Sequence, residues 1–294
     1  MPNQKALKPP SWLPKPFRKP MLDILMTQTI LDYYNSLEPH KISEEEHEAL
    51  SYIRKEGIQV FPYHFQDKYK KSEVEVFVDA KNGLKYVIEN DRKLYFKRKS
   101  SERGVKRNYN ALRIEQDVES AHRYLTQSFE VEDGDILVDV GAAEGNLPLS
   151  VMHKVKKVYL FETDPKWIEA LQATFEPWKE KVEIINKYVS DKNNDTHVTL
   201  DTFFKDKEPF TFLKVDAEGA ETSILEGCRT ILAENKPMKI AMATYHKPHD
   251  AEEIELFINQ YHFKSEFSEG FMIFPELKTF SPPYLRRGLI RAKR

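Results

Sequence analysis

The sequence predicts an α/β protein whose main domain is a Rossmann-like, doubly wound and mostly parallel sheet. From about residue 134 onward, short apolar runs alternate with stretches of helical periodicity. Near-continuous apolar strands are typical of parallel sheets with both faces covered, and right-handed helical crossovers connect such strands. A glycine-rich turn at 141–145, and the acid Glu162 at the end of the next strand, indicate a nucleotide-like ligand.

Five apolar runs and a closing hairpin account for a seven-stranded sheet. The hairpin is expected from HFKSEF and FMIFPEL, which flank Ser268-Glu269-Gly270, so one strand should run antiparallel to the others. Helical stretches lie between the strands at about 146–153, 165–175, 219–233 and 250–260. The parallel strands are expected at residues 136–140, 157–161, 182–186, 211–215 and 239–244.

An α+β extension is predicted over residues 21–110. Apolar side chains at helical spacing cover 22–36, and Ser43 begins a second helix through a capping box with Glu46. Residues 73–97 then alternate between apolar and polar side chains, which predicts an antiparallel meander of three short strands. We expect this region to form a cap that shapes the binding site for an acceptor.

A polar, basic connector over 98–107 leads to an expected helix over Leu112–Phe129, which enters the main domain. On this helix, His122 and Tyr124 are candidates for contact with the acceptor. The alternative is that this polar face is only solvated.

Composition limits the class of protein. The net charge is -2 although 31% of the residues are charged, so no overall field points to nucleic acid. The single cysteine, Cys228, excludes an intrachain disulfide and a cysteine-rich metal site, and it is expected to be buried. No run approaches the roughly 20 apolar residues of a membrane span, and no secretory signal is visible. We therefore expect a cytoplasmic location.

Both ends of the chain are basic. We expect a Pro-rich arm over residues 1–20 and a tail over 279–294, and the simplest interpretation is that both are solvated. The alternative is that they contact an anionic partner or a membrane surface.

The strongest candidate site is the loop after the first parallel strand, in DILVDVGAAEGN at residues 135–146. Glycine lets the backbone turn sharply and approach a ligand closely. Where the dinucleotide fingerprint has a glycine that makes room for pyrophosphate, this chain has Ala143, and Glu144 follows. Asp139 and Glu144 would repel a phosphate, whereas a ligand with a sulfonium and an ammonium group suits them. S-adenosylmethionine is such a ligand.

An acid stands 21 residues beyond Gly141, at the end of the second strand, where VYLF is followed by Glu162 and Thr163. An acid at about this distance from a glycine loop is placed to accept hydrogen bonds from the ribose hydroxyls. The alternative for a strand-end glutamate is a solvated surface residue, and the paired glycine loop argues against it.

Further polar residues follow the fourth and fifth strands. Asp216 and Glu218 lie at a strand end, on the edge where open α/β sheets bind ligands. Glu221 is as readily explained as a charge that favours the start of a helix. His246 follows the next strand, and a histidine there could take a proton from a hydroxyl, with Asp216 as the second choice of base.

The ordered set VDVGAAEGN, VYLFETDP, LKVDAEGAE and YHKPHD resembles the FkbM family of methyltransferases over about residues 112–275. The resemblance implies a class I methyltransferase fold over 111–278 and transfer of a methyl group from S-adenosylmethionine to an oxygen of a sugar, glycan or natural product. It implies Asp216 and Glu218 beside the reaction centre. It implies a donor site formed by Asp139, Gly141, Ala142, Glu144, Gly145, Glu162, Thr163, Val189, Ser190, Asp216 and Glu218.

Two other functions and a metal site are alternatives to this one. A nicotinamide-dependent oxidoreductase shares the sheet and the acid of the second strand, but it needs the absent G-x-G-x-x-G. A Rossmann-like fold can also serve as a non-catalytic binding or scaffold protein. Asp216, Glu218 and His246 offer oxygen and imidazole ligands, yet they form no tight cluster in the sequence, so no metal ion is expected.

Overall fold

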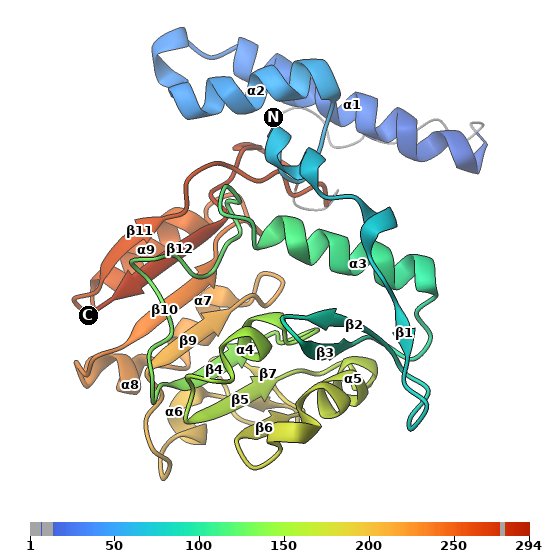
Figure 1. The fold of residues 1–294 in the computed structure, drawn as a ribbon. Helices are drawn as coiled ribbons and strands as arrows, with labels where there is room; N and C mark the ends of the chain where they lie inside the picture. Colours follow the sequence, from blue (N-terminus) through green and yellow to red (C-terminus); the bar gives the residue numbers. More distant parts are fainter. Residues whose placement is uncertain (1–6, 8–13, 277–279) are drawn as a thin grey trace.

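A seven-stranded sheet forms the centre of the computed structural model, which describes residues 7, 14–276 and 280–294 (Figure 1). The strand order is β11-β12-β10-β9-β4-β5-β6, and neighbouring strands are parallel except where β12 pairs. This confirms the predicted Rossmann-like fold. The strands are β4 Ile136–Val140, β5 Lys157–Phe161, β6 Val182–Ile185, β9 Phe212–Val215, β10 Lys239–Ala243, β11 Lys264–Phe267 and β12 Leu289–Lys293.

The strand order reverses between β4 and β9, which are parallel neighbours with Val140 opposite Val215. The chain leaves β4 at Gly141 and leaves β9 at Asp216, so both loops begin at the same edge of the sheet. Ligands of open α/β sheets bind at such a reversal, outside the carboxyl ends of the strands.

The predicted closing hairpin is wrong in its second strand. The partner of β11 is β12, and FMIFPEL instead forms a single bridge between Met272 and Arg286. The tail predicted to be solvated over 279–294 therefore supplies the antiparallel strand between β10 and β11. The strand is buried in spite of its basic residues. Leu289 and Ile290 have no exposed surface, and Arg291 donates to the carbonyl oxygens of Arg123 and Tyr124.

Two layers of helices cover the sheet, because alternate strand residues face opposite sides. Leu137 and Phe212 pack on the face covered by α4 and α5. Val138 and Leu213 pack on the face covered by α6 to α9. The helices are α4 Asn146–Val151, α5 Pro165–Phe175, α6 Leu200–Phe203, α7 Glu221–Glu226, α8 Arg229–Ala233 and α9 Asp250–Asn259. Among the described residues, no helix combines the length and apolar character that a membrane span requires.

The helical pair of the N-terminal region lies above the sheet, and its small meander lies lower, beside α5 (Figure 1). Helix α1 covers Lys15–Asn35 and α2 covers Glu44–Glu56, and the predicted capping box between Ser43 and Glu46 begins α2. The predicted meander is also confirmed, with antiparallel strands β1 Phe77–Val78, β2 Lys85–Glu89 and β3 Arg92–Tyr95. Of the basic arm predicted over residues 1–20, residues 1–6 and 8–13 lie outside the described part.

Helix α3 covers Glu102–Glu115, so the helix predicted over Leu112–Phe129 is wrong in most of its length. The helix begins earlier because the Ser101 hydroxyl accepts a hydrogen bond from Gly104 and caps it. Beyond its end, Gln116 donates to the His122 carbonyl and accepts from the Tyr124 amide, so its side chain organises a loop.

The segment from Gly270 to β12 joins the N-terminal helices to the sheet. Phe271, Ile273, Phe280, Tyr284 and Leu285 pack in one cluster with residues of α1 and α2. Glu45 of α2 accepts a hydrogen bond from the Gly270 amide and pairs with Arg287 at 2.7 Å.

Candidate active site

The glycine loop lies directly against the loop that follows β9. Gly141 has φ +76°, and a Cβ atom there would lie 2.0 Å from the backbone oxygen of Asp216. Gly145 has φ +75°, and a Cβ atom there would lie 2.8 Å from the side chains of Leu171 and Phe175 on α5. Both positions therefore require glycine, on grounds of conformation and of space.

The Glu162 carboxylate points at this loop. It accepts hydrogen bonds from the backbone amide of Ala143 at 2.9 Å, of Thr163 at 2.7 Å and of Asp164 at 2.8 Å. A carboxylate offers about four acceptor positions. The three amides thus fix the side chain at the end of β5 and leave it capacity to accept a further hydrogen bond.

A buried ion pair between Lys214 and Asp139 holds the glycine loop. Lys214 of β9 lies 2.8 Å from an Asp139 carboxylate oxygen, and its ammonium also donates to the Gly141 carbonyl at 2.8 Å. Burial disfavours the ammonium, but the carboxylates of Asp139 and Asp216 outweigh burial and raise the pKa of Lys214. Sequence reasoning missed Lys214, although a lysine in the apolar strand FLKV is itself a signal.

Asp216 is the centre of a cluster of polar side chains. Its carboxylate oxygens lie 3.2 Å from His122 Nε2, 2.9 Å from the Tyr124 hydroxyl, 3.3 Å from the Tyr245 hydroxyl and 3.5 Å from His246 Nε2. Burial alone would raise the pKa of Asp216, but His122, Lys214 and His246 lower it below its usual range. Asp216 is thus held as a carboxylate.

His246 lies between two carboxylates that face different ring nitrogens. Its Nε2 faces Asp216, while its Nδ1 lies 3.0 Å from Glu221 Oε1. Burial would lower the pKa of His246, but Glu221, Asp216 and Glu218 together raise it. Glu221 has no exposed surface, and its Oε1 also accepts from the amides of Ala217 and Gly219.

Asp216, Glu221 and His246 also form a possible metal-binding group, with one ligand atom from each within 4.8 Å of the others. The shortest contacts of the two carboxylates are with different nitrogens of the ring. One ion can bind only one of these nitrogens, so this geometry suits a ring held by Glu221 better than a chelate. Glu218, the third candidate ligand from the sequence, is 88% exposed and 3.9 Å from His246 Nε2.

The backbone around His246 is held by the C-terminal segment. The buried Arg286 donates to the carbonyl oxygens of Tyr245 at 2.8 Å and of His246 at 3.1 Å. Arg286 lies three positions before Leu289, the first residue of β12, so the last strand of the sheet positions the candidate base.

The remaining donor-site candidates are Ala142 and Glu144 in the glycine loop, and Val189 and Ser190 beyond β6. Ala142 is buried and its amide donates to the Phe161 carbonyl. Burial raises the pKa of Glu144 to about 7. Val189 and Ser190 are buried at the end of β7 Tyr188–Val189, which pairs with β8 His197–Val198.

The structure therefore brings Asp216, His246, His122 and Tyr124 together, and it leaves Glu218 exposed at the rim. Sequence reasoning missed Tyr245 and treated Glu221 as a charge at a helix start. Glu221 does begin α7, but its carboxylate turns back toward His246.

Comparison with known proteins finds similarity to methyltransferases. Residues 186–265 match the family described as Methyltransferase FkbM domain. No curated protein sequence matches the chain. The fold is similar to that of methyltransferase FkbM from Methylobacillus flagellatus KT, with 15% identity, 95% of this chain and 60% of that chain covered, and a TM-score of 0.48. This chain thus spans about 60% of the length of that protein.

Two other solved structures are similar over a shorter part of the chain. Precorrin-6y C5,15-methyltransferase from Geobacter metallireducens GS-15 has 11% identity, a TM-score of 0.39, and coverage of 56% of this chain and 84% of that chain. A Streptococcus mutans protein in complex with SAH has 17% identity, a TM-score of 0.38, and coverage of 56% and 91%.

Proposed function

We propose that this chain, a methyltransferase of the FkbM family, transfers the methyl group of S-adenosylmethionine to a hydroxyl of a sugar, glycan or natural product. The observation that supports O-methylation is the contact of Glu221 with His246 Nδ1 at 3.0 Å. It fixes the ring so that Nε2 faces Asp216 and the loop edge, where a hydroxyl proton can be accepted.

The residues at this edge fit the donor. Asp139, Gly141, Ala142, Glu144 and Gly145 form an acid-containing loop without room for a side chain at either glycine. When bound, S-adenosylmethionine supplies a methyl group on a sulfonium, which becomes the thioether of S-adenosylhomocysteine as the acceptor oxygen takes the methyl.

The donor's other parts have candidate partners on the neighbouring strands. Glu162 and Thr163 lie at the end of β5, where the ribose hydroxyls would be held. Val189, Ser190 and Glu218 complete the proposed donor site, with the first two on the adenine side. The arrangement needs no metal ion to orient the base.

His246 is a better base than Asp216 in this arrangement. A general base works best when its pKa lies near the working pH. The pKa of Asp216 is lowered, so its carboxylate is a weak base, whereas the pKa of His246 is raised above the ordinary value of 6.5. We assign Asp216 to stabilising the positive charge that the His246 ring gains when Nε2 accepts the hydroxyl proton.

His122 and Tyr124 remain proposed acceptor contacts, because both side chains reach the Asp216 carboxylate beside which the hydroxyl would lie. The small-molecule or glycan acceptor is the only partner that this site requires. We place the reaction in the cytoplasm, in keeping with the single buried thiol of Cys228.

Calorimetric titration with S-adenosylhomocysteine, NAD and NADH tests the donor class. We expect only S-adenosylhomocysteine to bind, and Glu162→Gln to weaken it about tenfold or more, as loss of charge-assisted hydrogen bonds implies. Glu180→Gln, at an exposed glutamate away from the loop, is the matched control. Binding of the nicotinamide cofactors instead would overturn the proposal.

A further inference from the structure

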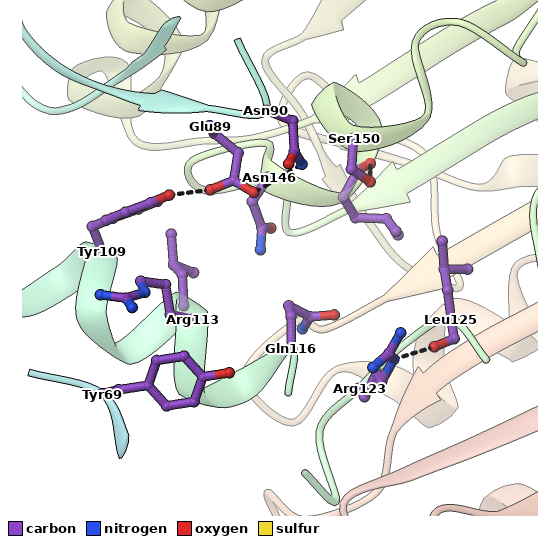
Figure 2. A pocket seen from close by; sticks show the side chains of 12 residues that line it. Tyr69, Glu89, Asn90, Tyr109, Arg113, Gln116, Arg123, Leu125, Asn146 and Ser150 are labelled. Carbon is purple, nitrogen blue, oxygen red and sulfur yellow. Dashed lines mark hydrogen bonds between the residues drawn. The ribbon is translucent and has the colours of Figure 1, made fainter. Parts of the chain in front are cut away.

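A cavity of about 370 Å³ lies between α3, the β2–β3 turn and the start of α4. Figure 2 shows Arg113 of α3, and Gln116 and Arg123 of the following loop, at its lower edge, opposite Glu89, Asn146 and Ser150. The cavity belongs to neither the glycine loop nor the Asp216 cluster, so it is a separate feature of the site region.

The cavity adjoins the proposed reaction centre through the backbone. Asn146 directly follows Gly145 of the glycine loop. On the other side, Gln116 holds the backbone of His122 and Tyr124, the two residues whose side chains contact Asp216. A molecule that fills the cavity therefore has the donor loop on one side and the segment carrying Asp216's partners on the other.

The charges that face the cavity favour an anion. Arg123 donates through Nε to the Leu125 carbonyl at 2.6 Å, and its guanidinium forms no ion pair with a carboxylate in the part of the chain that the structure describes. Arg113 stacks on the Tyr69 ring at 4.9 Å and lies 3.9 Å from a Glu73 carboxylate oxygen, so Arg123 is the cation that the lining leaves uncompensated. The one acid of the lining, Glu89, accepts hydrogen bonds from Tyr109 and Asn90.

The rest of the lining suits a polyhydroxylated ring. Asn90, Asn146 and Ser150 supply amide and hydroxyl groups, and Leu112, Leu125 and Leu147 supply apolar faces. Binding pockets combine apolar walls with a few polar groups that fix orientation. A planar guanidinium adds bidentate recognition of a carboxylate or a phosphate.

We propose that this cavity binds the part of the acceptor remote from the methylated hydroxyl, and that this part is a sugar ring carrying a carboxylate or a phosphate. The inference rests on the proposed function, because it places an acceptor beside the Asp216 cluster. It adds a charge requirement that the reaction centre itself does not impose.

Ligand-observed NMR titration of the full chain tests this proposal with glucose, glucuronate and glucose 6-phosphate as probes. We expect at least one anionic sugar to bind more tightly than glucose, and the comparison of the two distinguishes a carboxylate from a phosphate requirement. Arg123→Gln should weaken the anionic probe roughly 10-fold to 100-fold and leave glucose unchanged. Arg107→Gln, at an exposed position of α3 outside the cavity, should change neither.

Each probe is titrated with and without S-adenosylhomocysteine, whose own affinity is measured for every variant. The proposal is overturned if the anionic sugars bind no more tightly than glucose. It is also overturned if Arg123→Gln and Arg107→Gln lose the same affinity for the anionic probe. A loss of S-adenosylhomocysteine affinity in Arg123→Gln assigns the guanidinium to the donor and also overturns it. Failure of the wild-type chain to bind S-adenosylhomocysteine at all contradicts the methyltransferase function separately, whatever the sugars do.

Discussion

The Nδ1 atom of His246 lies 3.0 Å from a carboxylate oxygen of Glu221, a side chain with no exposed surface. The buried carboxylate stabilises the protonated ring and fixes the tautomer whose Nε2 accepts a proton. The two residues are 25 positions apart and meet because α7 and the loop after β10 begin at the same edge of the sheet.

Glu221→Gln should move the pH dependence of kcat. His246 is active as a base only when neutral, so activity rises with pH through its pKa, which Glu221 holds above 6.5. Removing the carboxylate lowers that pKa, and the rising limb should shift to lower pH. His246→Gln should lower kcat about 10²-fold to 10⁴-fold and remove the limb. An unchanged limb in Glu221→Gln would falsify the pairing, and Glu218→Gln, at an 88% exposed side chain, is the control.

Tyr124→Phe should lower kcat more than Tyr245→Phe does. Both hydroxyls donate to Asp216, at 2.9 Å and 3.3 Å respectively, and the shorter bond should orient the carboxylate more strongly. Loss of a hydrogen bond to a charged group costs about 1.5–3 kcal/mol, which is roughly tenfold or more in rate. Steady-state kinetics of both variants check this order, while the affinity for S-adenosylhomocysteine should stay constant. The reverse order would contradict the role of Tyr124.

Gly141→Ala should abolish binding of S-adenosylhomocysteine and destabilise the fold. Its Cβ atom would lie 2.0 Å from the Asp216 backbone oxygen, so the loop must move. Gly134→Ala is the matched control, because Gly134 has φ +88° but no atom within 4 Å of the added Cβ. That variant should lose only about 1–2 kcal/mol from backbone strain and keep donor binding. Calorimetry and chemical denaturation measure both, and equal behaviour of the two variants would show that the close approach has no importance.

Lys214→Met should lower the free energy of unfolding by about 3–5 kcal/mol, because Asp139 would remain buried without a partner. Urea denaturation measures the loss. The double variant Asp139→Asn/Lys214→Met should regain most of the stability but not the affinity for S-adenosylhomocysteine. A single variant as stable as the wild type would mean that the ion pair does not support the loop.

The sheet could be predicted from the sequence because its parallel strands are near-continuous apolar runs separated by stretches of helical periodicity. The glycine loop and Glu162 could also be predicted from the sequence, since their spacing follows from one βαβ unit. Strand β12 could not be predicted, because Arg286, Arg287 and Arg291 give this part of the sequence the composition of a solvated tail. Their guanidinium groups are instead satisfied by carbonyl oxygens and by Glu45, which only the folded chain brings near.

The Asp216 cluster depends on contacts that have no local signal. His122 and Tyr124 could be predicted as functional candidates, but on a helix, whereas the Gln116 side chain replaces helical hydrogen bonds by loop contacts. From the sequence, Glu221 is as readily explained as a charge that favours the start of a helix, and in the structure it does begin α7. Its second role requires the turn of residues 217–219, whose amides aim the carboxylate at His246.

One short stretch of chain belongs to three hydrophobic clusters. Tyr284 and Leu285 pack among α1 and α2, and Leu289 and Ile290, a few residues later, pack on opposite faces of the sheet. Separation of the helices α1 and α2 from the sheet would therefore also displace β12 and Arg286, which holds the His246 backbone. Heating should give one cooperative melting transition, and a fragment cut between α2 and the meander should not survive as a separate working enzyme.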